Sequence, residues 1–188
     1  MTYVQKQIKS PVGNLKIVAS DKGLAAILWE KMNFKGGPTC EDKTNPILLE
    51  TERQLIEYFK GERKIFTIEL DPIGTEFQQK VWKALQTIPF GETRSYGDLA
   101  KQIGKPSASR AVGAANGKNP IAIIIPCHRV IGSSGKLTGF AGGLNVKARL
   151  LNFENVATNL KTKAVQYFVK KSAFQDLPTD RALNRERQ

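Results

Sequence analysis

Short hydrophobic runs separated by turn residues open the chain and predict β-strands. The three runs are Tyr3–Ile8, Leu15–Ser20 and Leu24–Trp29. A turn that contains glycine separates each run from the next. A loop is expected over Met32–Thr44, which contains two glycines and a proline. The hydrophobic period then becomes helical after Asn45, which can cap a helix that begins at Pro46.

The segment Ile65–Leu70 is strand-like again, and the turn residues Asp71–Gly74 follow it. We place a domain boundary at this turn. The expected organisation is an N-terminal unit of strands and a helix over residues 1–73, a second unit over 74–154, and a basic extension over 155–188. The overall class is therefore α+β.

The second unit is predicted to be mainly helical. Thr75 and Gln78 form a capping box for a helix that runs to about Ile88. Ser95 can cap a short second helix over Tyr96–Ile103. Further along, an apolar run over Ile121–Ile125 predicts a buried strand. A glycine-rich loop and a helix over Asn145–Phe153 complete the unit.

A third short helix follows the second after a glycine-containing turn, which is a pattern typical of a helix-turn-helix. Ser107 or Ser109 can cap it, and it ends near Asn116. Arg110 is its only long charged side chain, and most of its other residues are Ala or Gly. Such a bare helix suits close approach to a DNA groove, but close packing inside the fold explains it equally well.

The charge of the chain is uneven. The formal net charge of +12 is made up of +1 over residues 1–73, +7 over 74–154 and +4 over 155–188. A basic excess confined to the middle and the end indicates a polyanionic partner at that surface. A solvated basic surface without a partner is the alternative.

Two cysteines, Cys40 and Cys127, and one histidine, His128, limit the covalent and metal chemistry. Two distant cysteines do not make a disulfide framework, and their number suits a cytoplasmic protein with reduced thiols. No metal-ligand spacing is present, so we expect no metal site and no cofactor. No apolar run is long enough to span a membrane, and no secretory signal opens the chain.

The strongest chemical motif is Ile125–Val130, in which Cys127 follows an apolar run and a proline. A free cysteine titrates near ~8.5, so a nucleophilic role needs a base. His128 can supply the base and Arg129 a positive field. If the segment is extended, neighbouring side chains point to opposite sides, and His128 would act on Cys127 through a water. An inert buried cysteine beside a structural histidine is the alternative interpretation.

This motif, together with its surroundings, resembles a known family. Pro126–Val130 resembles the active-site motif of the O6-alkylguanine-DNA alkyltransferases (methylated-DNA–protein-cysteine methyltransferases), of the stand-alone bacterial type. Further matching segments, in the same order along the chain, are Ser95–Ala100, Ser109–Asn116, Asn119–Pro120, Gly139–Leu144 and Lys147–Glu154. Several motifs in order over one stretch make chance an unsatisfactory explanation. The resemblance covers residues 75–154 strongly and the N-terminal unit in general layout.

The resemblance implies both a fold and an activity. The N-terminal unit would be RNase H-like, and the second unit would bind the minor groove of double-stranded DNA through the helix-turn-helix, without sequence preference. The protein would move an alkyl group irreversibly from O6-alkylguanine, and also from O4-alkylthymine, to its own cysteine in a single turnover. We expect a monomer, with cooperative binding along DNA left open.

Residue roles follow from the resemblance position by position. Cys127 resembles the alkyl acceptor and His128 the base, held by Glu154, while Asn119 shapes the turn before the site. The positions implied in substrate or DNA binding are Tyr96, Arg110, Ala111, Ala114, Arg129, Val130, Phe140, Ala141, Gly142 and Lys147. Arg110 would enter the base stack and Tyr96 would place a hydroxyl near the target base. Some relatives carry Tyr and Ser in place of Phe140 and Ala141, which bears on substrate range rather than on the reaction.

Three other functions compete with this one. A regulator that reads a specific DNA site would carry several long polar side chains on the second helix of the pair, where Arg110 is nearly alone. A lesion sensor of the same fold would lack the cysteine that Cys127 supplies. A thiol hydrolase would have no need of a basic surface for DNA.

Overall fold

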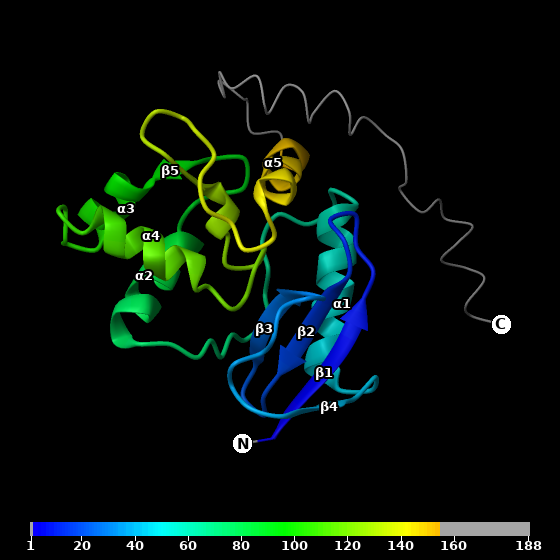
Figure 1. Ribbon diagram of the computed structural model, residues 1–188. Coiled ribbons are helices and arrows are strands. Elements are labelled where there is room, and N and C mark those ends of the chain that lie inside the picture. Colours follow the sequence, from blue (N-terminus) through cyan, green and yellow to red (C-terminus); the bar gives the residue numbers. More distant parts are fainter. Residues whose placement is uncertain (1, 155–188) are drawn as a thin grey trace.

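The computed structural model describes residues 2–154 of the chain, so the expected basic extension over 155–188 lies outside the described residues. Its N-terminal part is a four-stranded sheet (Figure 1). In spatial order the strands are β3 (Leu24–Trp29), β2 (Leu15–Ala19), β1 (Tyr3–Ile8) and β4 (Thr39–Glu41). β1, β2 and β3 are antiparallel neighbours, whereas β4 runs parallel to β1. The three predicted strands are confirmed. β4 was missed because it is three residues long and lies in the expected loop.

Helix α1 (Pro46–Phe59) packs against one face of this sheet (Figure 1). Its predicted cap is confirmed, since the Asn45 side chain accepts hydrogen bonds from two backbone N–H groups of the first turn. Leu48, Leu55 and Tyr58 are fully buried on the inner side of the helix. The other face of the sheet carries a smaller buried cluster that includes Tyr3 and Leu28.

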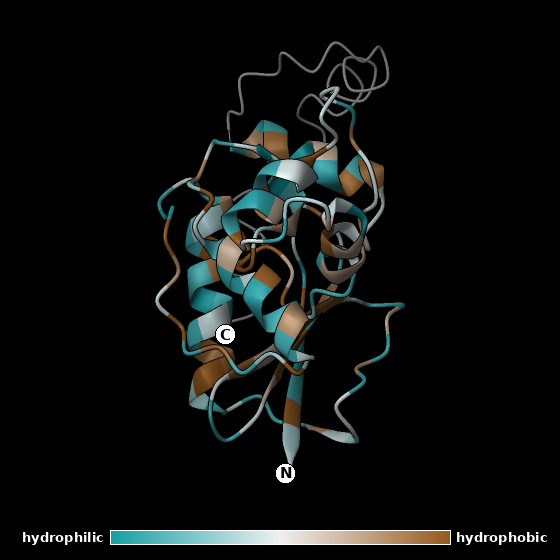
Figure 2. Cartoon of the chain, turned by 90° about the vertical axis from the view of Figure 1, so that its left-hand side faces the viewer, coloured by the Kyte–Doolittle hydropathy of each residue, from teal (hydrophilic) through white to brown (hydrophobic). Residues whose placement is uncertain are grey.

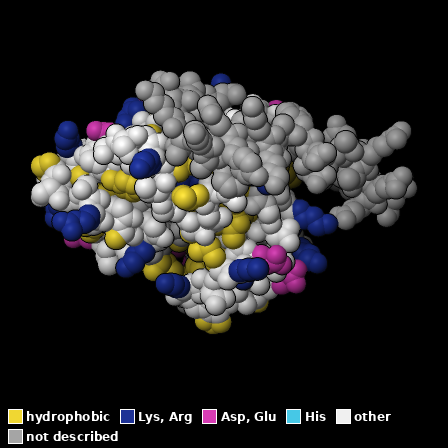
Figure 3. Space-filling view, turned by 45° about the horizontal axis from the view of Figure 1, so that its top comes forward, with side chains coloured by type: hydrophobic (Ala, Val, Ile, Leu, Met, Phe, Trp, Pro, Cys, Tyr) yellow, Lys and Arg dark blue, Asp and Glu magenta, His cyan; other side chains and the backbone are white. Residues whose placement is uncertain are grey.

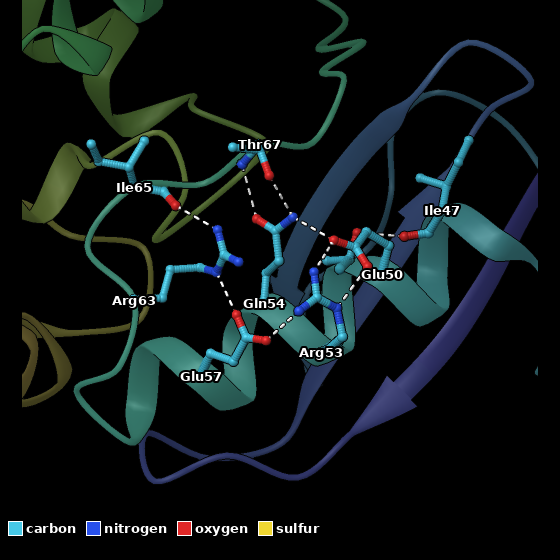
Figure 4. A network of polar contacts seen from close by, with 9 residues as sticks. Ile47, Glu50, Arg53, Gln54, Glu57, Arg63, Ile65 and Thr67 are labelled. Atoms are coloured by element: carbon cyan, nitrogen blue, oxygen red, sulfur yellow. Dashed lines mark hydrogen bonds and ion pairs between the residues drawn. The ribbon is translucent and has the colours of Figure 1, made fainter.

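The prediction of a strand over Ile65–Leu70 is wrong, apart from one isolated bridge between Leu70 and Leu24. The side chains of Gln54 on α1 and of Arg63 after it bond backbone groups that a strand would pair (Figure 4). The Gln54 side chain accepts from the Thr67 N–H and donates to the Thr67 hydroxyl. Arg63, just before the segment, donates to the carbonyl of Ile65. With these partners the segment lies along the helix as irregular chain.

The C-terminal part is built from short helices, as predicted. They are α2 (Glu76–Gln86), α3 (Tyr96–Gln102), α4 (Ser109–Gly117) and α5 (Leu144–Phe153). Capping boxes at Thr75 and Ser95 begin α2 and α3, and α4 packs against both of these helices. The predicted serine cap of α4 is wrong, because Ala108 occupies that position without a side-chain hydrogen bond. Figure 2 shows brown and teal positions mixed along the helical ribbons, so apolar and polar residues alternate within the helices.

The two parts share one buried core. A single hydrophobic cluster contains residues of the sheet, of α1 and of the C-terminal helices, including Ile27, Tyr58, Trp82 and Leu99. The edge of β3 also pairs with the C-terminal part, because the N–H of Ile27 donates to the carbonyl of Pro120 at 2.9 Å. None of the helices within residues 2–154 is long and apolar enough to cross a membrane.

The apolar run over Ile121–Ile125 is buried but forms compact turns, so the predicted strand is wrong. The N–H of Ile125 donates to the carbonyl of Ile121, and Ile123 has a φ of 72°. A β-branched residue rarely adopts this left-handed conformation, which therefore stores strain directly before the chemical motif. Local propensity favoured a strand, and the contact with the edge of β3 together with Asn119 overrides it.

We expect Gly23→Ala to destabilise the fold by about 1–3 kcal/mol. A Cβ at this position would lie 2.5 Å from the carbonyl oxygen of Glu69, which is backbone and cannot move aside cheaply. Gly117→Ala is the matched control, since a Cβ there meets nothing within 4 Å. Urea unfolding of both variants tests this, and equal stabilities would contradict the packing that we describe.

Candidate active site

The carboxylate of Glu154, at the end of α5, is the centre of a buried polar cluster. Its exposed fraction is 1%. Oε1 accepts hydrogen bonds from the Tyr58 hydroxyl at 2.7 Å and from Arg129 Nη2 at 2.9 Å, and it lies 2.8 Å from His128 Nε2. Oε2 accepts from Arg129 Nε at 2.8 Å and from the N–H of Gly91 at 3.4 Å. Each donor comes from a different part of the chain except the pair His128 and Arg129.

The charge states in this cluster follow from burial and from these bonds. Burial by itself would raise the pKa of Glu154, but the hydrogen bonds from His128 and Arg129 outweigh it and hold this pKa at about 2. Burial lowers the pKa of His128, and the opposing pull of Glu154 does not outweigh it. At neutral pH the carboxylate is therefore ionised and the imidazole neutral.

The tautomer of His128 is fixed by its partner. An ionised carboxylate only accepts hydrogen bonds, so Nε2 must carry the ring proton and donate it to Glu154. The other ring nitrogen, Nδ1, is then the basic one. It is buried and has no hydrogen-bond partner among the described residues. The cluster thus presents one unoccupied proton acceptor inside the protein.

Cys127 lies in a 3-10 turn, Cys127–Arg129, rather than in the extended segment that the sequence suggested. The thiol is buried, and this burial raises its pKa, although the Asn119 side chain and the charge of Lys147 act in the opposite direction. The resting sulfur is therefore a protonated thiol that needs a base to become nucleophilic. Among the described residues, no hydrogen bond joins the thiol of Cys127 to the imidazole ring of His128.

Asn119 holds the turn that carries the cysteine. Its Nδ2 donates to the carbonyl of Ile125 at 2.8 Å, and its Oδ1 accepts from the N–H of Ile121 at 3.0 Å. The side chain thus closes the strained segment on both sides of Ile123. The two bonds link the backbone before and after Ile123 within the turn that precedes Cys127.

The positive charge that acts on Cys127 comes from Lys147 of α5 rather than from Arg129. Lys147 is fully buried, and its Nζ donates to the carbonyls of Val130 and Thr138. Burial lowers its pKa to about 8. Arg129 is instead committed to Glu154 and to the carbonyl of Ile88. The structure therefore places both cations, and the fully buried side chain of Val130, inside the protein.

A loop with an aromatic support lies near Lys147. The Tyr96 hydroxyl donates to the carbonyl of Thr138 at 3.3 Å. Lys147 Nζ donates to the same carbonyl. Further along, the Phe140 ring packs edge-on against Trp29 with centroids 5.3 Å apart. A Cβ on Gly142 would lie 2.7 Å from the Trp29 ring, so only glycine fits there. Ala141, between them, is exposed.

Helix α4 has a bare outer face. Arg110, Ala111 and Ala114 are exposed, whereas Val112, Ala115 and Asn116 are buried on the inner face against the neighbouring helices. The sequence left two explanations for the small residues of α4, close approach to DNA and close packing inside the fold. Packing inside the fold explains the small residues of the inner face only. Figure 3 shows one face of the molecule, on which Lys and Arg side chains are spread widely and acidic ones occur in few places.

Comparisons with known proteins agree with this site. Residues 76–156 match the family model described as "6-O-methylguanine DNA methyltransferase, DNA binding domain", and residues 3–72 match its "ribonuclease-like domain". A methylated-DNA–protein-cysteine methyltransferase of Methanosarcina acetivorans is 51% identical over 78% of this chain and 94% of its own length. The chain belongs to this methyltransferase family. Family membership carries its activity, which is direct-reversal DNA repair by alkyl transfer to a cysteine of the protein.

Further relatives of the methyltransferase support the fold. The Mycobacterium tuberculosis enzyme is 51% identical over 79% of this chain and 90% of its own. The crystal structure of Mycobacterium tuberculosis OGT in complex with DNA has a TM-score of 0.75 at 50% identity, covering 82% of this chain and 93% of that one. An O6-methylguanine DNA methyltransferase from Methanococcus jannaschii is 26% identical with a TM-score of 0.59, covering 80% and 93%. The expected α+β class is thereby confirmed.

Sequence reasoning missed three residues that the methyltransferase fold brings to this region. Tyr58 and Gly91 contact Glu154, and Trp29 supports the loop. Tyr58 lies 96 positions from Glu154, and no motif connects them. The only sequence signal at Gly91 is its place in the Pro89–Gly91 turn, which follows the helix predicted to end at about Ile88. No group of three or more possible metal ligands occurs among the described residues.

We expect Glu154 to make the stability of the methyltransferase pH-dependent in acid. Its folded pKa of about 2 lies below the ordinary value of 4.5, so its stabilisation is fully present above about pH 4.5 and is lost as the pH falls through about 2. Relative to Glu154→Gln, the wild type should lose on the order of 3 kcal/mol over this window. Unfolding at a series of pH values measures it, with Glu62→Gln at an exposed position as the control. Parallel curves for wild type and Glu154→Gln would contradict the assignment.

Proposed function

We propose that Cys127 is the alkyl acceptor of this methyltransferase and that O6-alkylguanine in double-stranded DNA is its substrate, with O4-alkylthymine as a second one. The observation that carries the proposal is a buried thiol next to a histidine whose ring is oriented by an ionised carboxylate. Nucleophilic cysteines need such a base, and the base needs a group that fixes its tautomer. Cys40 is exposed and lies on β4, so it lacks this environment.

The proton of the thiol passes to His128 Nδ1 through one water, because no direct hydrogen bond joins the two side chains among the described residues. The imidazolium that forms is stabilised by Glu154 through Nε2. Arg129 neutralises part of the carboxylate charge and keeps Glu154 from taking the proton itself. The side chain of Lys147 stabilises the thiolate during its short lifetime.

The thiolate then attacks the alkyl carbon in line with the bond to O6. A carbon–sulfur bond forms, the carbon–oxygen bond breaks, and its electron pair leaves with the guanine, which is protonated afterwards. Hydrogen bonds to the base, including one from the Tyr96 hydroxyl after it exchanges the Thr138 carbonyl for the base, ease this departure. The thioether is stable in water, so each protein molecule reacts once. The balance needs no cofactor and no metal.

The damaged base must leave the helix to reach the site, because its O6 lies inside the stack. We assign DNA binding to the exposed face of α4, where Ala111 and Ala114 allow close approach to the minor groove and Arg110 fills the space of the flipped base. Phe140, Ala141 and Gly142 form a wall of the base pocket. Few long side chains on α4 mean little sequence preference, as repair requires.

The remaining expectations become part of the same proposal. The chain is divided at about residue 73, acts as a monomer and works in the cytoplasm, where both of its free cysteines stay reduced. A regulator that reads a DNA site is disfavoured by the bare face of α4, and a lesion sensor that does not repair is disfavoured by the presence of Cys127.

We expect the intact mass of the protein to increase by one methyl group per molecule after incubation with a duplex that contains O6-methylguanine, and by no more with excess DNA. Peptide mapping should place the group on Cys127. Cys127→Ser should gain nothing, and Cys40→Ser should react like the wild type. A methyl group on Cys40, or an unchanged mass in protein that binds the duplex, would refute the proposal.

We expect Ala114→Glu to weaken binding to duplex DNA roughly three- to tenfold at low salt, because it places a negative charge where phosphates approach. Leu49→Glu is the matched control, since it adds the same charge at an exposed position of α1. Binding of the wild type should fall at least about tenfold between ~50 and ~200 mM salt. Fluorescence anisotropy with a labelled duplex measures both. Equal losses in the two variants would move the DNA surface away from α4.

A further inference from the structure

A tyrosine from the N-terminal part of the chain reaches the carboxylate that orients the histidine. Tyr58 lies in the last turn of α1, and its exposed fraction is 0%. Its hydroxyl donates to Glu154 Oε1 at 2.7 Å, and His128 Nε2 lies 2.8 Å from the same oxygen. The sheet and α1 therefore contribute a polar group to a cluster that otherwise belongs to the C-terminal part.

Packing explains the ring of Tyr58 but not its hydroxyl. The ring contacts Phe59, Phe66, Phe90 and Phe153, with centroid distances between 5.1 and 6.2 Å. A phenylalanine would make these contacts equally well. A buried hydroxyl, in contrast, costs free energy unless it has a partner, and here the partner is an ionised carboxylate. The hydroxyl thus has a consequence for Glu154 that the ring does not have.

Several charged and titratable groups surround His128 and set the background for any effect of the Tyr58 hydroxyl on its charge state. Glu154 at the end of α5 faces Nε2, Arg129 of the 3-10 turn binds both oxygens of Glu154, and Lys147 of α5 acts on His128 from a greater distance. Tyr58 from α1 completes this set. Cys127 directly precedes His128 in the chain. Tyr58 is the one neutral hydroxyl that shares Oε1 with the histidine in the described part of the chain.

We propose that Tyr58 is a positioning residue of the alkyl transfer, whose hydroxyl fixes Oε1 of Glu154 against Nε2 of His128 and takes up part of the carboxylate charge. This inference rests on the proposed function of the same site. Through it, α1 determines how strongly Glu154 favours the charged form of the histidine. The N-terminal part thereby acts on the reaction without contacting the DNA lesion.

The direction of the effect follows from the sharing of one oxygen. Without the hydroxyl, His128 is left with a larger share of the negative charge on Oε1, which favours the imidazolium and raises the pKa of His128. The neutral imidazole is the form that accepts the thiol proton. A higher pKa therefore leaves less active protein in mild acid, and the acidic limb of the pH–rate profile moves to higher pH.

Tyr58→Phe tests this, because it keeps the ring and removes only the hydroxyl. We expect the single-turnover rate of methyl transfer on the acidic limb to fall roughly three- to tenfold, which corresponds to the net contribution of one ordinary hydrogen bond. The rate at high pH should change much less. Tyr3→Phe is the matched control, since Tyr3 is a buried tyrosine of β1 whose ring packs on Phe34 in the other cluster.

A second readout does not depend on activity. His128 is the only histidine of the chain, so its imidazole signals in an NMR titration of the free protein are unambiguous. Tyr58→Phe should titrate at higher pH than the wild type, and Tyr3→Phe should not. An unchanged titration, or a rate that falls equally at every pH together with the melting temperature, overturns the inference. A wild type that transfers no methyl group would instead refute the proposed function.

Discussion

An ionised carboxylate inside a protein must be surrounded by donors, and Glu154 imposes this requirement on the whole fold. Its two oxygens accept from a tyrosine of α1, a backbone N–H after α2, and the histidine and arginine that follow the cysteine. These groups come together only if the sheet, the helices and the reactive turn are all in place. Arg129 balances the charge, so the cluster as a whole is close to neutral and can remain buried.

The chemistry of the site depends on which groups of this cluster are charged and which carry a proton. Glu154 stays ionised, His128 stays neutral with its proton on Nε2, and Nδ1 is left as the basic atom. Cys127 is a thiol at rest, because burial raises its pKa. A resting thiol is protected from adventitious oxidation and alkylation, which is useful for a protein that reacts once.

The turn that presents Cys127 is a strained structure held from several sides. Ile123 has a positive φ, Asn119 bonds the backbone on both sides of it, and the edge of β3 bonds the segment through Ile27. Strain of this kind persists only where the surroundings determine the conformation more strongly than local preference does. The sheet therefore contributes to the site twice, through this edge and through the tyrosine on the helix that covers it.

The sequence by itself determined the elements with strong local signals and the residues that we propose to carry the reaction. The capping box at Thr75, the caps at Ser95 and Asn45, three strands and the motif around Cys127 were all readable, because short-range hydrogen bonds and hydrophobic period fix them. The family resemblance added Glu154 as the partner of His128, and the tertiary structure brought the two together, 26 positions apart.

Only the tertiary structure decided the rest. Two apolar runs form irregular chain rather than strands, because the side chains of Gln54 and Arg63 and the edge of β3 supply hydrogen-bond partners to their backbone. The tertiary structure directed Arg129 to Glu154 and left Lys147 as the cation whose charge acts on the Cys127 thiol, and it brought Tyr58 to Glu154. Such contacts join positions far apart in the chain, and neither periodicity nor spacing contains information about which distant donor will satisfy a buried charge.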